Sequence, residues 1–430
     1  MQSASTGIKR TLLVTIIGSL LCAGLILVFS RLSKIELISF ILQYSWLYLA
    51  IPFVGAIFLA LLFRYFNRYA KSGLPVVVMG YHFGDGKFQL GNAVFQYVAA
   101  IIALVSGFAV GAVGPALHVG AASMNLLGQY FHLNDTRLKQ LTACGAASAM
   151  AALFHTPITA IFFVQETIVR RFQWQTCVFI SICAFFSAWI ARQLGAFEFH
   201  IDTQSFHYQL TLIPELIVVG VVCGVLATLM LKLIRLTADN VMLPYWGKFL
   251  LAAAATSIAS LFGTEVLGLG SQLLQVLLYA DIGSQLVLTW LIVRFLISTI
   301  AIGAAIPGGA LGPSLLLGAL TGHWLAYLLP NETPQVFVLV GMAAFFGAVL
   351  KSPISATLLV VETTANVNLA LPCLVGSATA HLVQTRILGQ TNLIELLLAR
   401  QNILLKNSPS LLSKNKTQAS SSSGNDTTTN

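Results

Sequence analysis

The sequence predicts an all-α membrane protein that crosses the bilayer many times and is built from two similar halves of tilted and broken helices. Of its 430 residues, 57% are hydrophobic and only 9% are charged, whereas soluble domains have about 45–50% and about 25%. Apolar runs fill most of residues 11–400, enough for about ten spans at ~20 residues each. Many runs are short or contain Gly or Pro, and broken helices at membrane depth occur only against protein or a watery cavity.

An internal repeat is the second observation behind this fold. The run Gly111-Ala-Val-Gly-Pro115 matches Gly309-Ala-Leu-Gly-Pro313 in four of five positions. Further on, Gly145–Pro157 matches Gly341–Pro353 with the same spacing and at almost the same offset. Paired halves of broken helices are typical of transporters and channels, whose site lies where the halves meet near the middle of the membrane.

The chain divides into a short polar cytoplasmic lead (1–10), a first membrane repeat (11–210), a second (211–400) and a Ser/Thr/Asn-rich tail (401–430) that we expect to be disordered. The first apolar helix follows Lys9 and Arg10, so we place the amino terminus in the cytoplasm. It is too long for a signal-peptide core. The other expected apolar segments are residues 37–63, 91–110, 140–168, 175–193, 212–236, 248–263, 284–303, 313–329, 335–365 and 368–388.

The net charge of +9 does not indicate nucleic-acid binding, because the cations are scattered at the ends of apolar segments, as in cytoplasmic loops. They give only a weak attraction for anions. The chain shows no His/Glu zinc spacing, no Asp pair in an apolar helix and no Ser framed by glycines with a His partner. We therefore expect no enzyme activity and no cofactor. The six cysteines are expected to be small buried hydrophobes.

The stretch Gly111–Gly120 predicts a glycine-containing turn followed by an apolar helix, with Pro115 near the first helical position. The first N–H groups of such a helix are unpaired and carry the positive end of its dipole. Gly111 and Gly114 place no side chain in front of them. Inside a membrane this is a backbone anion site, and the repeat supplies a second copy, so two helix amino ends could converge on one anion.

Three motifs in order resemble those of the CLC family of chloride channels and proton/chloride exchangers. Residues 72–75, Ser-Gly-Leu-Pro, resemble the family's GSGIP, with Lys71 in place of the first glycine. Residues 111–115 resemble GREGP, and residues 309–313 resemble GxFxP with Leu311 for the aromatic residue. The resemblance covers roughly residues 11–400. It implies a CLC-type inverted repeat, a homodimer with one pore in each subunit, and cytoplasmic termini.

The resemblance also implies which residues bind chloride, the transported ion. The Ser72 hydroxyl, beside Gly73, would be a ligand at a central site, since a hydroxyl can donate one hydrogen bond to an anion. The backbone N–H groups of Ala310 and Leu311 would complete that site. The amides around Val113 and Gly114 would form an outer site.

Three positions depart from the family pattern. Val113 stands where GREGP has its gating glutamate, and Thr167 stands where the exchangers have a second, cytoplasmic-side glutamate. The family's pore tyrosine falls at about Ile394. Valine and threonine cannot carry a proton in the relevant pH range. Our hypothesis is therefore a passive, uncoupled chloride channel in a cell membrane, with a bacterial inner membrane as the expected location. Channels of the family with valine at the gate are a precedent.

Other functions stay open at this point. A proton-coupled chloride or fluoride antiporter could use His118 or Glu166 in place of the missing glutamates. An intramembrane enzyme has little support, and a homologue whose pore no longer conducts is a further alternative.

Several residues also have purely structural interpretations. Ser72 could only cap a helix, and the motif glycines could only allow close packing. Glu166 has a counterpart in Glu362, so we favour a shared structural role in accepting hydrogen bonds. We favour a packed neutral His118, and Arg294 needs a carboxylate or carbonyl partner that the sequence does not identify.

Overall fold

The structure is a computed structural model. It describes residues 2–33, 47–66, 73–82, 86–170, 172–195, 201, 212–240, 243–280, 282–329, 334–389 and 393–400. The first half contains α1 (Gln2–Ser33), α3 (Leu47–Phe66), α4 (Leu74–His82), α5 (Leu90–Val105), α6 (Val113–Tyr130), α7 (Asp135–Phe154), α8 (Pro157–Phe163) with its π-helical continuation η2 (Val164–Val169), and α9 (Trp174–Gln193). The second half contains α10 (Ile213–Asn240), α11 (Tyr245–Ala259), α12 (Ser271–Tyr279), α13 (Ser284–Gly303), α14 (Leu311–Leu328), α15 (Pro334–Leu350), α16 (Pro353–Thr364), α17 (Ala370–Leu382) and α18 (Leu393–Arg400).

Within the described part of the chain, seven helical stretches are long and apolar enough to cross a membrane: those in α1, α3, α9, α10, α11, α13 and the region of α17. This is fewer than the amount of apolar sequence predicts. The difference lies in helices such as α6, α7 and α14, which are rich in small residues and almost completely buried among other helices. Small residues allow helices to pack closely in a membrane. These helices therefore form the interior, and the long apolar ones surround it.

The amino-terminal lead does not form a separate segment. Helix α1 already begins at Gln2 and continues without a break through the first apolar run to Ser33. The expected tail, residues 401–430, lies outside the described residues.

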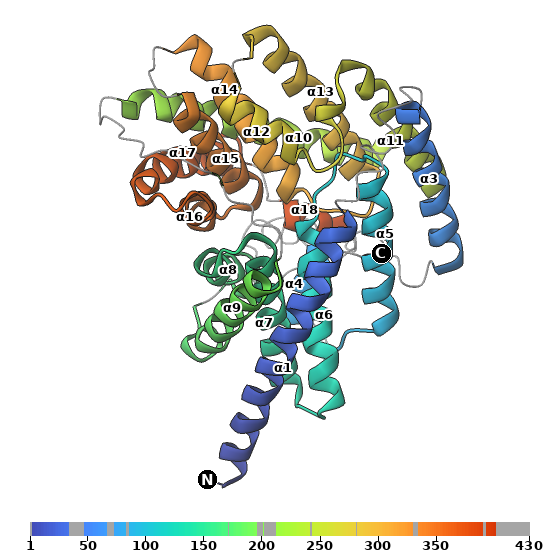
Figure 1. Cartoon of the computed structure of the whole chain (residues 1–430), viewed down its shortest axis with the longest axis vertical. Helices are drawn as coiled ribbons and strands as arrows, with labels where there is room; N and C mark the ends of the chain where they lie inside the picture. Colours follow the sequence, from blue (N-terminus) through green and yellow to red (C-terminus); the bar gives the residue numbers. More distant parts are fainter. Residues whose placement is uncertain are drawn as a thin grey trace, which may run out of the picture.

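The two halves repeat the same local structure, as the sequence predicts. Helix α7 ends at a left-handed residue, His155 (φ 57°), before α8 begins, and α15 ends at a left-handed Lys351 (φ 57°) before α16. These turns lie inside the two matching segments that end at Pro157 and Pro353. Figure 1 shows α6 to α9 of the first half on the opposite side of the molecule from α12 to α17, whereas α3 of the first half lies beside α11 of the second.

Glycine contacts also match between the halves. A Cβ atom added to Gly120 of α6 would lie 2.4 Å from the carbonyl oxygen of Gly145 in α7. A Cβ atom added to Gly318 of α14 would lie 2.1 Å from the carbonyl oxygen of Gly341 in α15. Both helix pairs therefore pack backbone against backbone. All six cysteines are free thiols, and all but Cys177 are buried, which confirms their prediction as small hydrophobes.

Candidate anion-binding site

The two motif loops meet directly at the centre of the protein. The backbone N–H of Gly111 donates to the carbonyl of Gly309 at 2.6 Å, and the N–H of Gly309 donates back to Gly111 at 2.7 Å. Helix α6 begins at Val113, two residues after this bridge, and α14 begins at Leu311. The amino ends of α6 and α14 therefore lie side by side, as the sequence predicts. Residues 106–125 are all buried, and so are Ala310 and Leu311, whereas Gly309 and Gly312 are half-buried.

This approach is possible only because the loops contain glycine. A Cβ atom on Gly309 would lie 2.7 Å from the backbone nitrogen of Gly114, and one on Gly114 would lie 2.9 Å from the Cα of Gly309. Real Cβ atoms essentially never come closer than 3.0 Å to other heavy atoms. The absence of a Cβ atom at these two positions therefore allows the two helix ends to come this close.

The helix ends carry unpaired donors. The first intrahelical bonds run from Ala116 to the carbonyl of Ala112 (3.0 Å) and from Ser314 to the carbonyl of Ala310 (2.9 Å). Pro115 and Pro313 have no N–H, and each is the third residue of its helix rather than the first. Their position inside the first turn is still one where a missing donor costs nothing.

The backbone N–H groups that remain are those of Val113 and Gly114 in α6, and of Leu311 and Gly312 in α14. No acceptor for them lies among the described residues. Buried N–H groups without a partner are rare in proteins, and at a helix amino end they favour negative charge. The geometry therefore fits a small anion held by backbone from both repeats.

A cavity of about 100 Å³ lies against the two helix ends, and we call it the tip cavity. Its lining comes from both repeats and from the end of α1: Ser30, Ser33, Ala112, Val113, Leu153, Phe154, Leu269, Gly270, Ser271, Leu274, Gly312, Leu315 and Leu316. The three serines are lining residues that no motif predicts, and they belong to segments far apart in the sequence. None of the described lining residues is charged.

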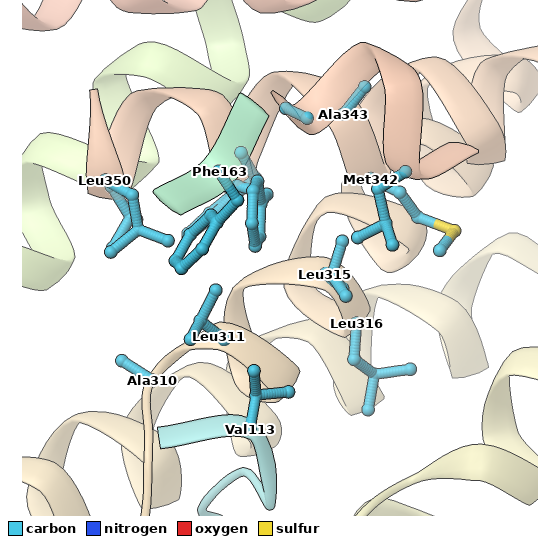
Figure 2. Packing of buried hydrophobic residues seen from close by; sticks show 14 of the residues in the cluster. Val113, Phe163, Ala310, Leu311, Leu315, Leu316, Met342, Ala343 and Leu350 are labelled. Carbon is cyan, nitrogen blue, oxygen red and sulfur yellow. The ribbon is translucent and has the colours of Figure 1, made fainter. Parts of the chain in front are cut away.

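Val113 lies at this junction, with only 2% of its surface exposed. Figure 2 shows its side chain near Leu311 and Ala310, with Phe163 and Leu350 on the other side of Leu311. Ala310 (5% exposed) and Leu311 (3%) are also buried, so the helix ends face protein rather than lipid. Val113 therefore occupies the tip of α6 without contributing a titratable group there.

Of the other predicted anion ligands, Gly73 lies beside helix α4. Ser72 is outside the described residues. Gly73 directly precedes α4 and has a left-handed backbone (φ 79°), which glycine adopts without strain. Its carbonyl oxygen lies 3.3 Å from Nδ1 of His118 on α6. The beginning of α4 is therefore linked to the same helix whose amino end carries the unpaired donors.

Ile394 is almost completely buried (1% exposed) near the start of α18. This helix packs against α4 and α15. The next residue, Glu395, fixes α18 by ion pairs with Nη1 of Arg170 at 3.5 Å and Nζ of Lys351 at 3.7 Å. An isoleucine here adds an apolar surface and cannot donate to an anion.

Glu166 and Glu362 accept hydrogen bonds across the two repeats. Glu362 on α16 accepts from the backbone N–H of Ile158 (3.0 Å) and from the N–H and hydroxyl of Thr159 (2.6 and 2.5 Å), at the start of α8. Glu166 on η2 accepts from the backbone N–H of Ser355 at 2.9 Å and from its hydroxyl, at the start of α16. Carboxylates are stabilised at helix amino ends. The shared structural role is confirmed, and the partners show that each repeat caps a helix of the other.

Thr167, the position of the exchangers' second glutamate, is 2% exposed, and its hydroxyl has no hydrogen-bond partner among the described residues. Arg294 finds carbonyl partners, as its burial requires. Its guanidinium donates to the backbone carbonyls of Val266 and, at 2.7 Å, Gly268.

Comparisons with known proteins agree with this geometry. The profile of the voltage gated chloride channel family matches residues 55–385. The H(+)/Cl(-) exchange transporter ClcA of Vibrio cholerae is 26% identical over 380 residues, which cover 83% of this chain and 80% of that protein. Among solved structures, a slow cyanobacterial Cl-/H+ antiporter has a TM-score of 0.82 at 23% identity and covers 91% of this chain and 98% of its own.

A CLC-type fluoride/proton antiporter is also similar, with a TM-score of 0.77 at 21% identity, covering 88% of this chain and 95% of that one. The two solved structures confirm the all-α CLC fold predicted from the sequence. The family profile spans most of the chain, and the paired helix ends lie inside it. This chain is therefore a multi-pass membrane protein that belongs to the voltage gated chloride channel (CLC) family.

Proposed function

We propose that this protein transports small monovalent anions, with chloride as the expected ion, past the paired amino ends of α6 and α14. One observation carries the proposal: four backbone N–H groups from two repeats lie together without an acceptor among the described residues, three of them on buried residues and one on the half-buried Gly312. An unpaired anion in a low-dielectric interior would cost several kcal/mol. Convergent N–H donors and two helix dipoles offset that cost without a fixed cation, so the ion can also leave.

We further propose that this transport is passive. One fold can serve many functions, so the shared fold alone does not imply proton coupling. Coupling requires titratable side chains along the path of the ion. Val113 at the tip of α6 and Thr167 on η2 cannot ionise at physiological pH. Leu311 and Ile394, the buried neighbours of the proposed path, are also apolar. An anion moving past these side chains has no group to exchange for a proton.

Proton-coupled exchange is the second candidate, and the relatives favour it over a passive channel. The Vibrio protein is named an H(+)/Cl(-) exchange transporter, and the two similar structures are titled antiporters. This mode would need a substitute proton carrier. The carboxylate of Glu166 is engaged at Ser355. His118 is the other possible substitute, because its Nε2 has no hydrogen-bond partner among the described residues.

Flux from proteoliposomes distinguishes these functions. Vesicles loaded with KCl receive either a potassium ionophore alone or a potassium and a proton ionophore together, and chloride efflux and internal pH are recorded. Passive transport predicts efflux with the potassium ionophore alone and no pH change. Proton movement driven by a chloride gradient, repeated with fluoride, would replace passive transport by exchange. Lack of any flux, with protein-containing vesicles matching protein-free ones, would contradict anion transport altogether.

The homodimer, the bacterial inner membrane and the lack of a cofactor stay predictions that follow from the resemblance and the composition. They are independent of the helix-end geometry that carries the proposal.

A further inference from the structure

We propose that an anionic phospholipid binds in an apolar groove between α1, α5 and α6, with an acyl chain along the groove and its head group at two lysines beside one end. This lipid site is separate from the paired helix ends and does not depend on the proposed function.

The groove has a volume of about 480 Å³ and opens on the outside of the first repeat. Helices α1 and α5 both pack against α6 (Figure 1). Residues of all three form its walls: Leu21, Leu25 and Val28 of α1, Leu90, Ala93, Val94 and Tyr97 of α5, and Val119, Ser123, Leu126, Leu127 and Tyr130 of α6. None of these lining residues is charged. Because α1 is long and apolar enough to span the membrane, the exposed part of the groove meets lipid chains in a bilayer.

The polar side chains in the middle of the groove bond within the protein. The hydroxyl of Tyr97 donates to the carbonyl of Leu25 at 3.1 Å, and the hydroxyl of Ser123 donates to the carbonyl of Gly120 at 2.9 Å. A hydrocarbon chain offers no hydrogen bonds, so burying an unpaired polar group beneath it would be costly. With these hydroxyls paired, the middle of the groove suits an acyl chain.

The length of the groove matches one leaflet of a bilayer. Val119 and Tyr130 lie at its two ends, eleven residues apart on α6, which is about 16 Å along an α-helix. The hydrocarbon core of a bilayer is ~30 Å thick, so one leaflet is about half of that. Tyr130 is exposed at the end of α6, and tyrosine is enriched at the level of the lipid head groups. The head group therefore belongs at this end of the groove.

Two lysines lie beside the same end. Nε2 of Gln129 on α6 donates to the backbone carbonyl of Phe88 at 3.0 Å, which fixes the loop of the exposed Lys87 next to the end of α6. The side chain of Lys139, near the start of α7, packs on the same loop, since a Cβ atom on Gly86 would lie 3.0 Å from its Cγ. The groove is thus apolar along its length and has cations at one end.

A phospholipid with a net negative head group fits both features. Its acyl chain matches the apolar walls, and basic clusters beside membrane helices bind anionic head groups. Asp135 lies one turn before Lys139 on α7, but no ion pair joins the two in the described part of the chain, so Asp135 does not neutralise this lysine by direct contact. A lipid without net charge would fill the groove and gain little from the lysines.

The role of the lysines is tested by lipid binding to the purified full chain. Native mass spectrometry compares phosphatidylglycerol with phosphatidylcholine of the same acyl chains, and we expect phosphatidylglycerol to bind at least about fivefold more tightly. Lys87→Gln with Lys139→Gln should remove this preference. Lys232→Gln with Arg235→Gln removes two exposed cations from α10 and should keep it. Equal binding of the two lipids to the unsubstituted protein, or an unchanged preference without the two lysines, would overturn the proposal.

The role of the groove is tested by filling it. Val94 is 53% exposed on the groove wall, whereas Val225 on α10 is 47% exposed and is not part of the groove. Val94→Trp should weaken phosphatidylglycerol binding at least about fivefold, because the acyl chain loses its place against the wall. Val225→Trp, the matched control, should leave binding unchanged.

Three results of this second experiment would overturn the lipid site. The first is unchanged phosphatidylglycerol binding by Val94→Trp. The second is displacement of the lipid by soluble glycerol phosphate at the same concentration, which would indicate a site for a free phosphate. The third is a change of oligomeric state in Val94→Trp, measured by light scattering, which would assign the groove to a second copy of the chain.

Discussion

Replacing Val113 with glutamate should lower anion flux strongly and make the remaining flux depend on pH. Val113 lies at the amino end of α6, 2% exposed, beside the unpaired N–H groups of the tip. An ionised carboxylate there would compete with the transported anion for the same donors, because helix amino ends favour negative charge. As the pH falls, the carboxylate becomes protonated and neutral, and the competition ends. Glutamate titrates near pH 4.3 in water, so flux should rise as the pH is lowered into the acid range.

The matched control is Val113→Gln, which has nearly the size of glutamate and no charge. It can narrow the path, but its flux should not vary with pH in the way that Val113→Glu does. Both variants are measured by chloride efflux from proteoliposomes between neutral and acid pH. Unchanged flux of Val113→Glu at every pH would place Val113 outside the anion path.

Gly309→Ala should reduce both anion transport and stability. Its added methyl group would lie 2.7 Å from the backbone nitrogen of Gly114, so the two helix ends must separate. Separation breaks the paired hydrogen bonds between Gly111 and Gly309 and spreads the four N–H groups. Overpacking costs about 1–3 kcal/mol of stability. Weakening a hydrogen bond to a charged group costs about 1.5–3 kcal/mol, which corresponds to a loss of about tenfold or more in anion affinity.

Gly24→Ala in α1 is the control for this substitution, because a Cβ atom at Gly24 would meet nothing within 4 Å. That variant should melt and transport like the unsubstituted protein. Thermal unfolding in detergent and chloride efflux are measured for both. Wild-type melting and flux in Gly309→Ala would show that the contact between the two loops is not needed.

The fold could be predicted because the low charge content and the internal repeat are properties of most of the chain. The low charge content indicated a membrane protein, and the matched segments ending at Pro157 and Pro353 indicated two similar halves. These segments form the same turn, with left-handed residues at His155 and Lys351. The number of full spans was less predictable, because helices such as α6 are buried by packing rather than by apolar composition.

The core of the candidate site was also predictable. The repeated glycine and proline residues indicated two helix amino ends, and the bridge between Gly111 and Gly309 joins them. The structural role of Glu166 and Glu362 followed from their equivalent positions. Their partners could not be predicted, since Ser355 and Thr159 each lie in the opposite repeat.

The rest of the site depends on contacts between distant segments, for which the sequence holds no local signal. Ser30 and Ser271 line the same cavity although they belong to different repeats. Arg294 required a partner inside the membrane, but the carbonyls of Val266 and Gly268 become available only through the tertiary fold. The transport mode could not be predicted from the fold, because it depends on single titratable side chains. The names of the relatives favour proton-coupled exchange, whereas Val113 and Thr167 of this chain favour passive transport.

The central claim is that backbone N–H groups of α6 and α14 bind one anion between them, and anomalous scattering from bromide tests it most directly. In crystals grown with bromide in place of chloride, we expect a bromide peak within hydrogen-bonding distance of the amides at Val113 or Gly114 and at Leu311 or Gly312. Bromide peaks found only at other positions, with none beside these amides, would contradict the account.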